Sequence, residues 1–479
     1  MRSMMRFLVV LALLLPASAL AQSNIAFPPE VYAGRRARLA EAMGDGVAIV
    51  PGRHLIRRTS RGPIKQDPAF WYLTGVETVY GVAVISGSGT ELFLPEEFQF
   101  AGGQYPMAER DRFRHAKWNL PGPWRLHAGD EAIAGVDEIY PVDTLGERLE
   151  GLVAKADVVY LPLERRSLYA PPGFDPPKGV YAQMVDAIRS KLGAKKIEDL
   201  TPLVDRMRLI KDDHEIAALR RAAAISGDGL IEAMRRMKPG MTTLEIAGVM
   251  EAVWKREGSP RAAFATIVRT GPQMTFFTLA NEQYDATRRV IGESDLVFID
   301  DGAAEYKMYT SDLCRTIPAS GKFTAEQRKY YDIVNEAREA AIAAVKPDAM
   351  LLDAVKAAAR VFQSHGLEQY EDVEAMGEDK VWGLLPSPTN YLTRDAGMVR
   401  GIRALGHFIG LEVADPADYT RPLEPGMVFT VEPKIYIPEK GITIMIEDMV
   451  LVTETGHENL SPHAPTDPDA IERLMASSR

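Results

Sequence analysis

The sequence predicts an α/β (α+β) protein with two domains, and three observations lead to this prediction. The chain has 479 residues, of which 46% are apolar and 25% are charged, so it is globular and long enough for two or three domains. Strand-like and helix-like segments alternate up to residue 161, as they do in an α/β domain. Two later stretches, 296–316 and 428–452, have the pattern of β-hairpins.

The first 21 residues have the features of a cleavable signal peptide. Residues 1–6 contain two arginines, residues 7–15 are apolar, and Ala19-Leu20-Ala21 has the small-x-small form that signal peptidase cuts. The apolar run is too short for a retained membrane span. We therefore expect the mature chain to begin near Gln22 and to be periplasmic or secreted. Cys314 is the only cysteine, so an intrachain disulfide is impossible.

The elements that follow divide the mature chain into two parts. In the first part we expect a helix over 32–43, strands over 46–50, 81–85 and 91–94, and, after a Pro/Gly-rich passage at 170–177, a helix over 180–192. In the second part a long helix runs from 207 through 237 and another covers 243–258. This change of pattern places the boundary near residue 204, with domains over 22–203 and 204–479.

The first hairpin carries candidate metal ligands. If its bend centres on Tyr306 and Lys307, Asp301 lies directly opposite Asp312 on one face of the hairpin. Asp300 is the competing candidate, but strand alternation points it to the face opposite to that of Asp301. We therefore expect Asp301 to be the ligand, unless a bulge shifts the register by one residue.

The second hairpin repeats this arrangement. A turn over 438–441 sets Glu432 opposite Glu447. Like charges directly opposite each other destabilise a sheet, and burying them unpaired costs several kcal/mol each. Two hairpins with facing carboxylates therefore indicate a cation between them, and the simplest such cation is one metal ion, or two.

Several passages of the chain resemble one family of enzymes. The chain is similar to the aminopeptidase P and prolidase branch of the pita-bread metallopeptidases in the passages 66–75, 208–221, 238–241, 301–316, 406–410 and 423–433. The resemblance covers nearly the whole mature chain, with an insertion around 368–398. It implies a creatinase-like α/β domain at the N-terminus and a pita-bread domain at the C-terminus, whose sheet holds the metals.

The resemblance also implies a set of ligands. The family's two aspartates fall on Asp301 and Asp312, its histidine on His407, and its glutamates on Glu432 and Glu447, and only Asp301 preserves the family's separation of 11 residues between the aspartates. An oxygen-rich site with one imidazole suits Mn²⁺, with Co²⁺ or Zn²⁺ as alternatives. Two such ions about 3.5–4 Å apart can hold a hydroxide as the nucleophile. By resemblance, Glu432 acts as the general base and acid.

Other kinds of site are disfavoured by the sequence. His214-Glu215 begins like a zincin helix, but Ala218 stands where the second histidine is required. The sequence contains no Gly-rich phosphate loop and no G-x-S-x-G serine elbow. The net charge of −10 argues against a nucleic-acid partner. After cleavage of the signal peptide we expect no membrane association.

The sequence departs from the family's pattern around the ligands. Family members usually carry a histidine where this chain has Ala414, and another near Thr278. Arginine is common at the position of Met445, and glycine is usual at the position of Lys434. The five ligand-type residues are present, whereas several of their usual neighbours are replaced.

Two functions from different classes fit these observations. The first is an exported metallopeptidase that cleaves the bond between an N-terminal residue and proline, as an aminopeptidase or a dipeptidase, with weak or atypical specificity. The second is a metal-binding pseudoenzyme that holds a peptide or another ligand without turnover. The five retained ligands favour the enzyme, because a carboxylate cluster without a metal is only destabilising. The resemblance also implies a homo-oligomer, either a dimer or a tetramer.

Overall fold

The computed structural model describes most of the chain between Ala26 and Ser477. The described residues are 26–53, 65–78, 80–94, 135–163, 180–193, 195–271, 288–301, 305–367, 405–419, 421–437 and 440–477. The expected signal peptide, Thr278 and the insertion around 368–398 lie outside them. The chain divides into two compact units, Met1–Val204 and Asp205–Arg479. Among the described residues, no helix combines the length and apolar character that crossing a membrane requires.

The first unit is built on one mixed sheet in the order β4-β3-β2-β1-β5-β6. Its strands are β1 (Val47–Pro51), β2 (Val82–Ser86), β3 (Gly89–Leu94), β4 (Glu138–Pro141), β5 (Val158–Leu161) and β6 (Lys196–Asp199). Strands β1, β2 and β3 are antiparallel neighbours, whereas β4, β5 and β6 are each parallel to the strand beside them. The three expected strands correspond to β1, β2 and β3.

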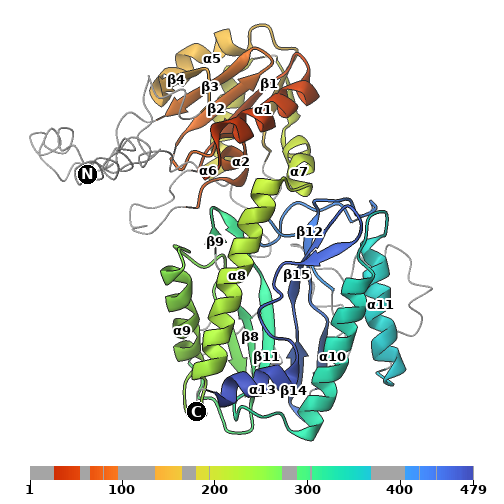
Figure 1. The fold of residues 1–479 in the computed structure, drawn as a ribbon. Helices are drawn as coiled ribbons and strands as arrows, with labels where there is room; N and C mark the ends of the chain where they lie inside the picture. The colour runs from red at the N-terminus through yellow and green to blue at the C-terminus, as the bar shows by residue number, and fades with distance from the viewer. Residues whose placement is uncertain are drawn as a thin grey trace, which may run out of the picture. The chain divides into compact units, whose positions relative to one another are not determined.

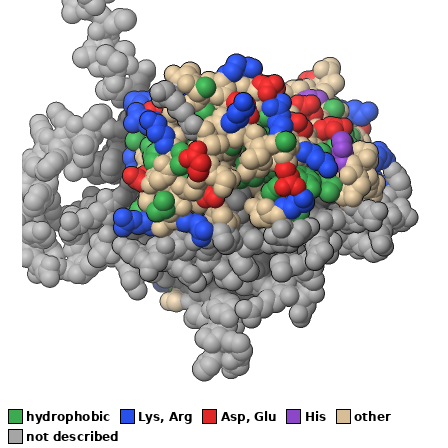
Figure 2. All heavy atoms as spheres, turned by 90° about the horizontal axis from the view of Figure 1, so that it is seen from below, with side chains coloured by type: hydrophobic (Ala, Val, Ile, Leu, Met, Phe, Trp, Pro, Cys, Tyr) green, Lys and Arg blue, Asp and Glu red, His purple; other side chains and the backbone are tan. Residues whose placement is uncertain are grey.

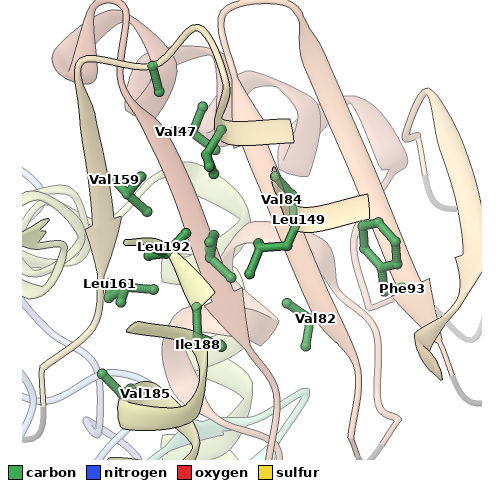
Figure 3. Packing of buried hydrophobic residues seen from close by; sticks show 13 residues of the cluster. Val47, Val82, Val84, Phe93, Leu149, Val159, Leu161, Val185, Ile188 and Leu192 are labelled. Carbon is green, nitrogen blue, oxygen red and sulfur yellow. The ribbon is translucent and has the colours of Figure 1, made fainter. Parts of the chain in front are cut away.

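Helices cover this sheet with an apolar core between the layers. They are α1 (Pro29–Met43), α2 (Pro68–Thr74), α5 (Leu145–Val153), with the short 3₁₀ turn Val142–Thr144 before it, and α6 (Val180–Lys191). Val47, Val84 and Phe93 of the sheet pack with Leu149 of α5 and Ile188 of α6 (Figure 3). The expected helices over 32–43 and 180–192 are α1 and α6.

The second unit combines short sheets with long helices. The sheets have the strand orders β11-β8-β7, β10-β9, β12-β15-β16 and β13-β14, in which β7 is Ile267–Thr270 and β16 is His457–Asn459. The helices are α8 (Asp213–Arg236), α9 (Thr243–Arg256), α10 (Ala325–Ala343), α11 (Leu351–Ser364) and α13 (Pro468–Ala476). Helix α8 packs on β8, β9, β10 and β11, and α9 packs on β7 (Figure 1). Helix α10 packs on β12, β13 and β14.

The long helix expected over 207–237 is in fact two helices. The first, α7 (Thr201–Leu209), ends before Ile210, and α8 begins at Asp213. The side chain of Asp212 accepts a hydrogen bond from the backbone N–H of Glu215, and the Glu215 carboxylate accepts one from the N–H of Asp212. This capping box starts a new helix and therefore interrupts the pattern that was read as continuous.

Lysine and arginine side chains do not gather into one patch on the coloured part of the face drawn in Figure 2. Among the coloured side chains there, lysines and arginines alternate with aspartates and glutamates, and hydrophobic side chains form only small groups. This mixture agrees with the net charge of −10.

Candidate metal centre

The second hairpin has the register that the sequence predicts. Val431 of β12 (Val428–Val431) faces Asp448 of β15 (Asp448–Val452). Lys434 of β13 (Lys434–Ile437) faces Met445 of β14 (Ile442–Met445). These pairs enclose Glu432 and Glu447, which therefore lie across from each other. The predicted opposition of the two glutamates is confirmed.

The register predicted for the first hairpin is wrong by one residue. Asp301 of β8 (Leu296–Asp301) faces Leu313 of β11 (Leu313–Pro318), and Asp300 faces Cys314. The chain turns at Lys307 and Met308, which have φ of 51° and 70°. They connect β9 (Glu305–Tyr306) to β10 (Tyr309–Thr310). A two-residue turn with positive φ at both positions is usually marked by Asn or Gly, and no such residue marks it here.

The position of the turn alone would shift the pairing by two residues, and one extra residue before the turn reduces the shift to one. Three residues separate β8 from β9, whereas two separate β10 from β11. The first side of the hairpin therefore has one residue more than the second between its paired strands. Since side chains alternate between faces, a shift of one residue exchanges Asp300 and Asp301 between the two faces of the sheet.

The exchange brings Asp300 to the carboxylate cluster. Asp300 faces Cys314, and Cys314 in turn is bridged to Glu447, so these three residues share one face. Asp312, two residues before Cys314, lies on the same face. Asp301 lies on the other face, where Ser226 Oγ of α8 donates a hydrogen bond to Asp301 Oδ1 at 2.7 Å. The expectation that Asp301 stands opposite Asp312 is thus corrected, and Asp300 takes its place on the face of Asp312 and Glu447.

His407 enters the site from a segment that runs close to β12. The N–H of His407 donates to Thr430 Oγ1 at 3.1 Å, and the N–H of Thr430 donates to the His407 carbonyl at 2.8 Å. Gly406 permits this approach, because its φ is 152° and a Cβ there would lie 1.9 Å from the Thr430 carbonyl oxygen. Nδ1 of His407 lies 3.2 Å from the Phe408 carbonyl, so Nε2 is free to face the carboxylates.

The imidazole and the carboxylates converge on one small region. Nε2 of His407 lies 3.3 Å from Asp312 Oδ2 and 3.9 Å from Glu432 Oε1. Asp312, His407 and Glu447 each offer a ligand atom, and these atoms lie within 4.8 Å of one another. The structure thus brings together four of the five residues predicted as ligands, Asp312, His407, Glu432 and Glu447, and places Asp300 rather than Asp301 on their face.

Unsatisfied carboxylate oxygens show that this region fits a cation. Asp312 is 4% exposed and Glu447 is 1% exposed, yet Asp312 Oδ1 and Glu447 Oε1 accept no hydrogen bond. A buried oxygen without a partner costs free energy, and a divalent cation would satisfy both oxygens at once. Asp301 Oδ2 also has no hydrogen-bond donor, but its partner Ser226 marks it as belonging to the other face.

Burial and the repulsion between carboxylates raise the pKa of several groups in the site. Burial raises the pKa of Asp300 and of Glu447, and the charges of Asp312 and Glu432 raise both further. Burial alone would lower the pKa of His407, but the hydrogen bond and the charge of Asp312 outweigh it and raise this pKa to about 9. Each of these pKa shifts favours the protonated form, so metal binding at this site competes with protons.

A buried network of ion pairs and hydrogen bonds lies next to the segments that carry the candidate ligands. Arg315 Nη2 donates to Asp448 Oδ1 at 2.7 Å, and Arg338 donates to Asp448 Oδ2. Arg315 also donates to the carbonyls of Cys314 and Glu447. These contacts join the strand that carries Asp312 to the segment that carries Glu447.

A second buried network fixes the loop that contains Ala414. Lys211 Nζ lies 3.1 Å from Asp415 Oδ2, and Arg208 Nη2 lies 2.5 Å from Asp415 Oδ1. Arg208 also contacts Glu412 at 3.0 Å. Ala414 itself is exposed and brings no polar side-chain atom to this loop.

The sequence singles out Lys434 as a departure from the family's pattern, but its contact with Glu432 was not predicted. Its Nζ lies 3.0 Å from Glu432 Oε2. The signal that could have found it is strand alternation, because a residue two positions after Glu432 in an extended chain lies on the same face.

Comparisons with known proteins agree with this fold and site. The model of metallopeptidase family M24 matches residues 217–454, and that of the aminopeptidase P N-terminal domain matches residues 32–160. The chain is 31% identical to the Xaa-Pro aminopeptidase of Escherichia coli strain K12, over 93% of this chain and 97% of that protein. It is 30% identical to Xaa-Pro aminopeptidase 1 of Streptomyces coelicolor, over 93% of this chain and 87% of that protein.

Solved structures give the same result. Aminopeptidase P from E. coli with the inhibitor Pro-Leu matches with a TM-score of 0.74 and 29% identity, over 95% of this chain and 99% of that chain. Proline aminopeptidase P II from Yersinia pestis matches with a TM-score of 0.74 and 28% identity, over 94% and 100%. The chain belongs to metallopeptidase family M24, in its aminopeptidase P branch. It is an Xaa-Pro aminopeptidase-like metallopeptidase, with an aminopeptidase P N-terminal domain and a pita-bread domain, which confirms the predicted family and fold.

Proposed function

We propose that this enzyme removes an N-terminal residue that precedes proline, or splits an Xaa-Pro dipeptide, by metal-dependent hydrolysis. The observation that carries the proposal is the pair of buried oxygens without donors, Asp312 Oδ1 and Glu447 Oε1, beside the imidazole of His407. Enzymes of family M24 use divalent metal ions, and these donors fit such ions. No feature of the described residues favours the alternative, a metal-binding pseudoenzyme.

The proposed ligands are the four carboxylates that share one face of the two hairpins and the imidazole of the segment that runs beside β12. They are Asp300, Asp312, His407, Glu432 and Glu447. Four carboxylates and one imidazole favour Mn²⁺, with Co²⁺ or Zn²⁺ as alternatives. The relative from E. coli has also been solved in a zinc-substituted form in complex with product. We propose two ions per chain, because four carboxylates neutralise two divalent charges.

The chemistry divides between the metal and the chain's own residues. Divalent ions, when bound, polarise a peptide carbonyl and lower the pKa of water. Glu432 is the proton carrier in the proposal: its carboxylate takes the proton of the attacking water and passes it to the leaving proline nitrogen. Its Oε1 lies 3.9 Å from His407 Nε2, so this oxygen faces another proposed ligand.

The loop around Ala414 suggests that turnover of ordinary substrates is slow. A donor aimed at a developing oxyanion is worth about 2.7–4 kcal/mol, and Ala414 offers no such donor. We therefore propose weak or atypical specificity. The N-terminal segment supports export to the periplasm or beyond, and the resemblance supports a homo-oligomer.

One experiment tests the reaction directly. The mature protein, loaded with Mn²⁺, Co²⁺ or Zn²⁺, is incubated with a library of peptides that carry proline or alanine at the second position. Loss of the first residue only from the proline peptides, read by mass spectrometry, is the expected result. Asp312→Asn should abolish it, and an active Asp312→Asn protein or cleavage that ignores proline would contradict the proposal.

A further inference from the structure

Lys434 is a cation built into the metal centre. It lies two residues after Glu432 at the start of β13, and its Nζ is 3.0 Å from Glu432 Oε2. The side chains of Lys434 and Glu432 are only 16% and 8% exposed. Nζ also lies 3.7 Å from Sδ of Met445, which faces Lys434 on β14. The ammonium group is therefore enclosed between the two strands and directed toward the ligands.

The charge of Lys434 acts on more than one ligand. Its Nζ lies 3.0 Å from Glu432, which stands across the hairpin from Glu447, so the ammonium group lies next to the cluster of carboxylates. In the metal-free protein it thus partly compensates the repulsion within the cluster. A metal ion that enters the site meets this positive charge at short range, so the same residue opposes metal binding.

The contact also selects one oxygen of Glu432. Lys434 holds Oε2, while Oε1 is turned toward His407 Nε2 at 3.9 Å. The hydrogen bond to Oε2 uses one of its lone pairs and favours Oε1 as the oxygen that faces a metal. This restricts both the orientation and the mode of binding of the residue that is proposed to carry the proton.

We infer that Lys434 is a positioning residue that fixes Glu432 through Oε2. Its charge stabilises the metal-free protein and lowers the affinity of the site for metal. The inference rests on the proposed function, because it takes Glu432 to be a ligand and proton carrier. It predicts two separable effects, one from the charge of Lys434 and one from its hydrogen bond.

Substitutions at position 434 separate these effects. Lys434→Met removes both the charge and the donor, whereas Lys434→Gln keeps a donor and removes only the charge. Both should bind Mn²⁺ at least about tenfold more tightly in competition with a chelator, because one positive charge is gone. Both should also lower the melting temperature of the metal-free protein. Only Lys434→Met should lower kcat strongly with KM little changed, and Lys434→Arg should restore wild-type behaviour.

A relocated charge and a matched control complete the design. Met445→Arg in the Lys434→Met background brings a cation to the same place from the facing strand, so it should return Mn²⁺ affinity toward the wild-type value. Lys440 of the same hairpin is more exposed and pairs with Glu326, so Lys440→Met should change neither Mn²⁺ affinity nor kcat.

The outcomes distinguish this inference from the proposed function. If Lys434→Gln and Lys434→Met match Lys440→Met in Mn²⁺ affinity and in metal-free melting temperature, the inference is wrong. If wild-type protein binds Mn²⁺ but cleaves no Xaa-Pro peptide, the proposed reaction is wrong, while the Mn²⁺ affinities still decide the role of Lys434. If Lys434→Met does not fold, Lys434→Gln alone tests the effect of the charge on metal affinity.

Discussion

The two adjacent aspartates differ in what surrounds them, and this difference can be tested residue by residue. Asp300 lies with the carboxylates, whereas Asp301 receives a hydrogen bond from Ser226 on the other face. Asp300→Asn should lose at least one metal ion, measured by elemental analysis of dialysed protein. Asp301→Asn, its matched control, should keep the metal. Full metal content in Asp300→Asn together with metal loss in Asp301→Asn would restore the original expectation.

Restoring a lost donor is a second test at the scale of one residue. Ala414→His places an imidazole in the loop fixed by Asp415, where it can stabilise the developing oxyanion. It should raise kcat for Xaa-Pro peptides by a factor on the order of ten or more, with a smaller change in KM. Ala417→His, at another exposed alanine nearby, should leave kcat unchanged. Equal kinetics for the two variants would show that position 414 does not reach the substrate.

Protonation of the ligands predicts how stability depends on pH. Burial, and then the charges of neighbouring carboxylates, raise the pKa of Asp300 and of Glu447. Burial alone would lower the pKa of His407, but the hydrogen bond and the charge of Asp312 raise it to about 9. Groups with a raised pKa stabilise the folded state fully below their unfolded pKa, and this stability is lost as pH rises through the folded pKa. Urea unfolding of metal-free protein should therefore show a free energy of unfolding that falls from about pH 5 to about pH 9.

Metal should reverse this trend. Binding displaces the protons, so the affinity for Mn²⁺ should rise over the same range of pH. Stability of the metal-free protein that rises with pH over this range would contradict the proposed state of the empty site.

At the scale of elements, buried ion networks hold the ligand-bearing segments in place. Asp415 neutralises Arg208 and Lys211, which are 5% and 4% exposed. Asp415→Ala leaves two buried cations without their carboxylate and should lower the free energy of unfolding by about 3–5 kcal/mol, measured in urea. Glu412→Gln changes only the outer, partly exposed contact of Arg208, so it should cost less than about 1 kcal/mol. Similar losses of unfolding free energy in both variants would show that Asp415 stabilises the fold no more than Glu412 does.

The hairpins show which parts of an element a sequence can specify. The register of the second hairpin was predictable because Gly441 and Pro438 mark its turn between β-branched strands. The turn of the first hairpin was not, because Lys307 and Met308 adopt positive φ without Asn or Gly. Both faces of this hairpin are buried, so no alternation of polar and apolar residues reports the register.

The same reasoning applies to the site. Asp312, His407, Glu432 and Glu447 were predictable because each stands in a short, distinctive context. Asp300 was rejected on a correct rule, strand alternation, applied to a wrong register. Lys434 was noticed as a departure. Strand alternation places it on the face of Glu432, but whether its long side chain reaches that carboxylate depends on a rotamer that periodicity does not describe.

At the scale of the whole molecule, metal should stabilise one unit of the chain. All proposed ligands lie in the unit Asp205–Arg479. Mn²⁺ at about 100 times its Kd should stabilise that unit by about 2.7 kcal/mol. Hydrogen exchange should then slow in β12 and β15, while β1 and β2 of the other unit serve as the internal control. Equal slowing in both sets of strands would show that the units do not respond independently.

The extra residue between β8 and β9 has a consequence for how relatives of this enzyme are compared. In this chain the first aspartate of the cluster stands 12 positions before Asp312, whereas Asp301 stands 11 before it. An alignment without gaps therefore pairs a relative's ligand with a residue that points away from the site. Ligand assignment by spacing fails wherever such a one-residue insertion precedes a turn. Pairing each candidate with its cross-strand partner, here Cys314 for Asp300, identifies the equivalent residue despite the insertion.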